Sequence, residues 1–115
     1  MTSVNESLGD WLERELSGAP QELAVRVRTA LPPEWRVARL VNGPAILTAA
    51  AAAELRGLLE RGCETRWAAP GLLTVDALVT YACELLACAG ADVDVGTLQI
   101  LSVMAQTLPQ EDPIA

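Results

Sequence analysis

The feature that most restricts the fold is a helical repeat of apolar residues between positions 74 and 89. Apolar side chains recur there at the i, i+3, i+4 spacing of an α-helix. Asp76, Thr80 and Glu84 form the only clearly polar wedge, so we expect this helix near the centre of a bundle. The apolar positions are Val75, Leu78, Val79, Ala82, Leu85, Leu86 and Ala89.

The same spacing recurs along most of the chain, and a strong hairpin signal is missing. The 115 residues are 51% hydrophobic, enough for the core of one soluble domain. We therefore expect an all-α fold, a compact bundle of four to five helices in a single domain over residues 1–115. The other helices are predicted at residues 3–17, 20–31, 43–62 and 95–108, with residues 109–115 as a flexible acidic tail.

Capping signals support the ends of these helices. Ser3 and Glu6 form a capping box, and Asp92 or Asp94 is expected to cap the last helix. Two regions allow alternatives. Residues 34–42 fit an irregular or a short helical connector, and residues 62–73 fit either a loop or a longer helix kinked at Pro70.

The helix predicted at residues 43–62 has two further faces. Thr48, Ala52, Arg56 and Glu60 are expected to face water. Ala49, Ala53 and Gly57 form a stripe of small residues that would let another helix approach closely, although alanine is also simply the best helix former.

Composition excludes several classes of function. The chain contains no histidine, all eight of its basic residues are arginines, and the net charge is −7. Without imidazole, Ser/His/Asp and Cys/His nucleophile sites cannot be built, and zinc sites lack ligands. Every arginine lies at or before Arg66, so the remainder of the chain repels phosphate backbones and anionic lipids. We expect neither nucleic-acid nor membrane binding.

Targeting and redox signals agree with a cytoplasmic protein. The first residues do not resemble a signal peptide, and the longest apolar run, near residues 45–53, is too short to span a bilayer. Three cysteines without CxxC spacing are expected to be structural thiols. Cys63 is the alternative reactive site, because Arg61 and Arg66 flank it and favour its thiolate.

The remaining polar residues offer little chemistry. Asp92 and Asp94 lack the later ligands of a calcium loop, so we expect no metal, and no phosphate-binding glycine motif indicates a cofactor. Asp76 and Glu84 lie eight residues apart on one side of the central helix, and we expect them to be an N-terminal helix charge and a solvated or arginine-paired glutamate. Catalytic carboxylates are the alternative for these two residues.

Two segments resemble known families. Residues 72–86 resemble one core helix of the all-α polyprenyl diphosphate synthases, but the DDxxD motifs that bind magnesium and diphosphate in that family are missing. The tripeptide at Asp76, Ala77 and Leu78 is similar to the attachment site of acyl carrier proteins. Ala77 has no hydroxyl to carry a phosphopantetheine arm. A small helical enzyme or enzyme-accessory subunit is therefore the alternative function.

The last predicted helix gives the preferred function. Residues 95–110 carry no charge and present two apolar faces, so this helix is either buried or shared with another chain. We expect a non-catalytic protein–protein interaction or assembly subunit, bound to a protein partner or to itself. The candidate interface consists of Leu98, Ile100, Val103, Met104, Thr107 and Trp67.

Overall fold

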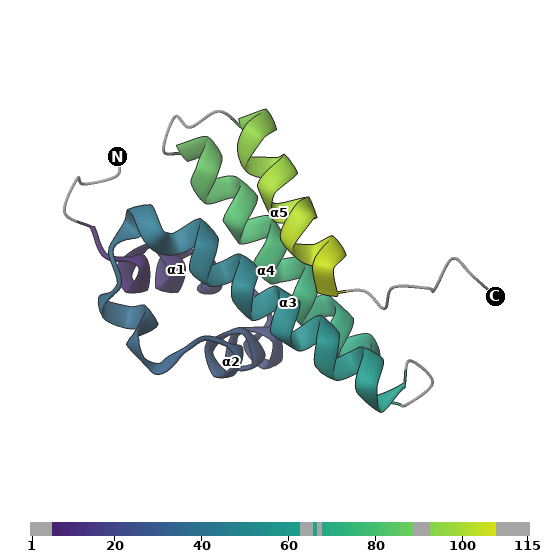
Figure 1. Ribbon diagram of the computed structural model, residues 1–115. Coiled ribbons are helices and arrows are strands. Elements are labelled where there is room, and N and C mark those ends of the chain that lie inside the picture. The colour runs from purple at the N-terminus through teal and green to yellow at the C-terminus, as the bar shows by residue number, and fades with distance from the viewer. Residues whose placement is uncertain (1–5, 63–65, 67, 89–92, 108–115) are drawn as a thin grey trace.

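The computed structural model describes residues 6–62, 66, 68–88 and 93–107, with the side chains of 93, 94 and 97 left aside. Along these residues the chain is helical almost throughout, which confirms the predicted all-α bundle (Figure 1). The elements are α1 (Leu8–Leu16), α2 (Gln21–Ala30), η1 (Pro33–Val37), η2 (Leu40–Asn42), α3 (Gly43–Arg61), α4 (Ala68–Cys88) and α5 (Val93–Thr107), where η marks a 3-10 helix.

The centre of the bundle is the antiparallel pair of α3 and α4 (Figure 1). This pair makes the most extensive helix–helix interface of the described residues. Leu47 of α3 and Leu78 of α4 are fully buried in one cluster that also receives side chains from α1 and α2. Asp76, Thr80 and Glu84 are exposed, so the predicted central position of this helix and its polar wedge are both confirmed.

Helix α1 begins later than predicted. Its N-cap is Ser7, whose Oγ accepts a hydrogen bond from the backbone N–H of Asp10 at 3.1 Å. The predicted cap, Ser3, lies outside the described residues. The buried face of α1 consists of Leu8, Trp11, Leu12 and Leu16, as the apolar spacing predicts.

The segment between α2 and α3 resolves into the two short 3-10 helices, so the helical alternative for this connector holds. It packs against the start of α1, because the N–H of Leu8 donates to the carbonyl of Ala38 at 2.9 Å. The backbone approach is close at Gly9, where an added Cβ would lie 2.8 Å from the Cα of Arg36. Glycine is therefore required at position 9 by tertiary packing.

Helix α3 ends at Arg61 and is followed by Gly62, which has a φ of 87°, and α4 begins at Ala68. Pro70 therefore lies in the first turn of α4, where its missing N–H breaks no hydrogen bond. The helix starts earlier than residue 74 and runs through Pro70, so the alternative of a longer helix holds from Ala68 onward. Position 65, where that longer helix would begin, lies outside the described residues.

Helix α5 packs on α3 and α4, on the side away from α1 and α2 (Figure 1). It begins at Val93, so Asp94 lies inside the helix and is not the cap, which leaves Asp92 of the two predicted caps. Asp92 and the predicted acidic tail, residues 109–115, lie outside the described residues. Thr48 and Ala52 of α3 are 4% and 6% exposed, which corrects their predicted contact with water.

One described helix, α4, has the length and apolar composition that a membrane span requires. The prediction that no segment can span a bilayer was based on the shorter apolar run near residues 45–53. The core helix of a folded bundle satisfies the same criterion, and α4 packs against α2, α3 and α5. We therefore treat α4 as the central helix of a compact globule.

Candidate interaction surface

Helix α5 has an inner face that packs into the bundle. Ile100 is 4% exposed and belongs to the buried core, and Met104 packs against the same cluster. Gly96 lies one turn before Ile100 on this face, and an added Cβ there would lie 2.7 Å from a methyl carbon of Leu86. The absence of a side chain at Gly96 therefore makes room for Leu86 of α4 to pack against α5.

The opposite side of α5 is apolar but open to solvent. Val95, Leu98 and Leu101 are 51%, 65% and 57% exposed. Between Val95 and Thr107 the chain has no charged residue. Large aliphatic side chains without neighbouring charges on the same helix are unusual for a solvated surface. We refer to the exposed set Val95, Leu98, Leu101, Ser102 and Ala105 as the outer face of α5.

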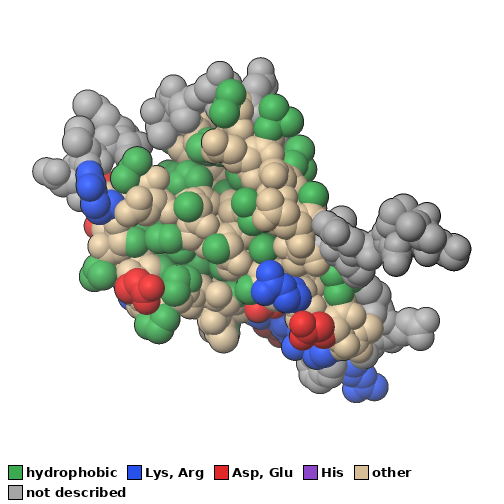
Figure 2. Space-filling model, viewed as in Figure 1, with side chains coloured by type: hydrophobic (Ala, Val, Ile, Leu, Met, Phe, Trp, Pro, Cys, Tyr) green, Lys and Arg blue, Asp and Glu red, His purple; other side chains and the backbone are tan. Residues whose placement is uncertain are grey.

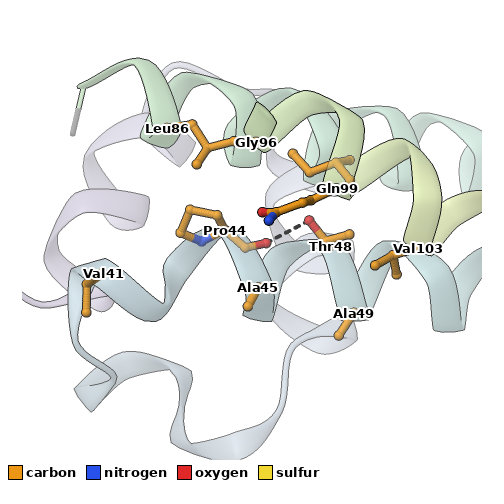
Figure 3. A pocket seen from close by; sticks show the side chains of 10 residues that line it. Val41, Pro44, Ala45, Thr48, Ala49, Leu86, Gly96, Gln99 and Val103 are labelled. Atoms are coloured by element: carbon orange, nitrogen blue, oxygen red, sulfur yellow. Dashed lines mark hydrogen bonds between the residues drawn. The ribbon is translucent and has the colours of Figure 1, made fainter. Parts of the chain in front are cut away.

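A groove with a volume of about 430 Å³ lies between α3 and α5, on a different side of α5 from Leu98 and Leu101 (Figure 3). Thr48, at its base, donates its hydroxyl hydrogen to the carbonyl of Pro44 at 2.7 Å, and Gln99 extends toward Thr48 from α5. No charged side chain is among the residues that line the groove. They are Val41, Pro44, Ala45, Thr48, Ala49, Leu86, Gly96, Gln99, Ile100 and Val103.

The stripe of small residues on α3 is only partly used. Ala49 and Ala53 are exposed, and no helix of the described chain covers them, so the predicted close approach of a second helix is not observed there. A second shallow hollow lies on the other side of Ala49, toward the end of α2 and Pro32. Figure 2 shows the molecule from the same side as Figure 1. The middle of the visible face is hydrophobic or neutral, and charged side chains gather at its two ends.

The six candidate interface residues fall in different environments. Leu98 and Val103 are exposed, as an interface requires, at 65% and 40%. Ile100 is buried inside the bundle, which corrects its placement on an open face, and Met104 and Thr107 are half-buried. Trp67 lies outside the described residues. The α5 residues missed as interface candidates are Val95 and Leu101.

A sequence signal for the correct side of α5 did exist. Gly96, Ile100 and Met104 recur every four residues, and glycine at such a position favours close packing against a neighbouring helix. Both sides of α5 have similar hydrophobicity, so periodicity by itself could not distinguish them. The packing of Leu86 against Gly96 decides which side is inside.

The alternative reactive residues do not form one site in the described structure. Cys63 lies outside the described residues, and Asp76 and Glu84 are both exposed on α4. Glu84 instead interacts with Glu15 of α1. Partial burial raises the pKa of Glu84, and the charge of Glu15 and a hydrogen bond shared with it add to this effect.

Aromatic residues lie beside this carboxylate pair. The ring of Tyr81 meets the edge of Trp11 with ring centroids 6.4 Å apart. Burial raises the pKa of Tyr81, with additional contributions from Glu84 and Glu15. Trp11 is 2% exposed, so its indole ring is buried where α1 meets α4 and does not line a substrate cleft.

Metal-binding groups are also sparse. In the described ranges, no three Cys, Asp or Glu side chains come close enough together to hold a metal ion. The clearest ionic cluster is a structural one, in which Arg28 donates two hydrogen bonds of 2.9 Å to Glu13 and Arg36 donates one of 3.2 Å. The hydrogen bonds from Arg28 lower the pKa of Glu13.

Comparison with known proteins adds no functional information. The chain matches no protein-family model, no curated protein and no solved structure.

Proposed function

We propose that this chain is a non-catalytic protein–protein interaction or assembly subunit that binds through the outer face of α5. The observation that carries the proposal is the exposure of Leu98 and Leu101, at 65% and 57%, on a helix segment without charge. A partner that covers these side chains removes apolar surface from water, which is favourable at roughly 25 cal/mol per Å².

The groove between α3 and α5 supports the more general proposal that this chain binds a protein. Val103 and Gln99 of α5 and Ala45 and Ala49 of α3 line it, on a different side of α5 from Leu98 and Leu101. An apolar side chain from a partner can enter such a groove without displacing a charged group. Buried anchors of this kind usually dominate the affinity of protein interfaces.

The cellular setting is proposed as the cytoplasm. Cys83 and Cys88 are free thiols, which are typical of a reducing compartment. The function is proposed without a cofactor or a metal, and without nucleic acid or lipid as partner, because the strongly uneven charge disfavours anionic surfaces.

Site-specific photocrosslinking in cells tests this function. A photoreactive amino acid at position 98 is expected to give a covalent product with a protein partner, whether foreign or a second copy. Position 25 is the matched control, because Val25 is 51% exposed on α2, far from α5 in Figure 1. The proposal fails if position 98 gives no product, or if both positions give the same product.

A further inference from the structure

We propose that the partner of the outer face of α5 is a second copy of this chain, bound so that the two α5 helices run antiparallel. The inference rests on the proposed function, which requires only that some protein binds this face. Charge, residue spacing and side-chain size on α5 favour a second copy over a foreign partner.

The charge distribution restricts where two copies can meet. Each chain carries a net charge of −7, so two copies repel one another over most of their surfaces. The segment from Val95 to Thr107 has no charge, so contact there brings no carboxylates together. A basic partner would gain more by binding the acidic surfaces, whereas an uncharged face is matched by an identical uncharged face.

The spacing on the outer face is that of a helix pair. Leu98, Leu101 and Ala105 follow one another at intervals of three and four residues, the heptad pattern of side chains that pack between two helices. All three are exposed. The inner face of α5 already contacts α3 and α4, so this second seam has no partner within the described part of the chain.

Side-chain size favours the antiparallel arrangement. A two-fold axis near position 101 places Leu98 of one copy opposite Ala105 of the other, and the two Leu101 side chains meet near the axis. A parallel pair would set the small Ala105 side chains opposite each other and leave a void, while Leu98 met Leu98. Protein interfaces of good affinity are packed as densely as interiors, so the antiparallel pair is preferred.

The size of the face limits the affinity. With 15 residues, α5 is about 22 Å long, so a single helix face falls below the roughly 800 Å² per partner of a standard interface. We therefore expect a reversible dimer with a dissociation constant in the micromolar range, rather than a permanent one.

Sedimentation velocity of the purified full chain tests the proposal over a range from about 1 to 300 μM. The parent is expected to shift from the 12.2 kDa monomer to a species of twice that mass as concentration rises. Raising the salt concentration should strengthen the dimer, because salt screens the repulsion between two acidic chains. A parent that stays monomeric throughout overturns this inference but leaves the crosslinking test of the proposed function intact.

Two substitutions of similar exposure locate the interface. Leu101→Arg is expected to weaken dimerisation at least about 30-fold, because the interface would bury an unpaired charge, whereas Val25→Arg should leave the dimer unchanged. Circular dichroism verifies that both variants fold, and Leu101→Ser serves as a milder substitute. Dimerisation that survives every change at position 101, or is lost equally in Val25→Arg, overturns the proposed face.

Disulfide trapping tests the orientation. In a chain whose native cysteines are replaced by alanine, a Leu98→Cys copy mixed with an Ala105→Cys copy should give a crosslinked heterodimer under mild oxidation. A parallel pair would instead crosslink Ala105→Cys copies to one another. That result, or no crosslink in a mixture that sediments as a dimer, overturns the antiparallel arrangement.

Discussion

Ile100 and Leu101 are neighbours in the chain, about 100° apart around α5, and their exposed fractions are 4% and 57%. Ile100→Ala should lower the free energy of unfolding by about 2–5 kcal/mol, because it leaves a cavity in the core. Leu101→Ala should change it by less than about 0.5 kcal/mol in dilute monomer. Urea unfolding at submicromolar concentration measures both, and equal losses would contradict the orientation of α5.

Gly9 provides a test of the contact between α1 and η1. In Gly9→Ala the new Cβ would lie 2.8 Å from the Cα of Arg36, so the backbone must shift, and we expect a loss of about 1–3 kcal/mol. Gly57→Ala is the control, since its Cβ would be 3.6 Å from the Arg61 side chain. Alanine should stabilise α3 there by up to about 1 kcal/mol, and thermal unfolding distinguishes the two outcomes.

The ion pair between Glu13 and Arg28 predicts a loss of stability in acid. Arg28 lowers the pKa of Glu13, so the pair stabilises the fold above the ordinary carboxyl value near 4.5, and this contribution disappears as pH falls through the lowered pKa. Glu13→Gln should cost about 1 kcal/mol at pH 7, because the groups are part-exposed, and almost nothing near pH 2. Glu22→Gln, an exposed α2 variant, is the control in urea titrations at both pH values. A Glu13 variant with the same deficit at both pH values would show that the carboxylate charge is not responsible.

Glu84 predicts the opposite pH dependence. Its pKa is raised in the fold, so the folded state holds the proton more tightly and stability decreases as pH rises through the raised pKa. Glu84→Gln should therefore stabilise the protein at pH 7 by less than about 1 kcal/mol, with the advantage fading near pH 3. Asp76→Asn on the same exposed wedge should have a smaller effect. Destabilisation by Glu84→Gln at neutral pH would show that Glu15 does not repel the Glu84 carboxylate in the folded state.

Much of the fold could be predicted because local signals and packing agree. The apolar stripe of α4 is long enough to fix both its helical period and its central position. Gly43, Pro44 and Gly62 mark the two ends of α3 within a residue. The start of α1 could not be predicted, because two serines lie close together there. Ser3 and Ser7 can each cap a helix, and a cap at Ser7 agrees with the tertiary hydrogen bond from Leu8 to Ala38.

The candidate surface could be predicted only in part. The absence of charge between Val95 and Thr107 was visible in the sequence and correctly indicated a helix with two apolar faces. Which face is inside depends on how Gly96 fits against Leu86, a contact between two helices that a single periodic pattern does not encode. For this reason Ile100 was assigned to the open side, and Leu101 was not recognised as a surface residue.

The most direct test of the outer face of α5 is the alkylation rate of single cysteines placed at positions 98, 100 and 25 in a chain without native cysteines. Trace amounts of each variant are mixed with increasing amounts of unmodified chain. We predict slow alkylation at position 100 and fast alkylation at position 25 in every mixture, whereas position 98 should react fast in dilute protein and at least several-fold more slowly in concentrated protein. Position 98 reacting equally fast throughout, or more slowly than position 100 in dilute protein, would contradict the account.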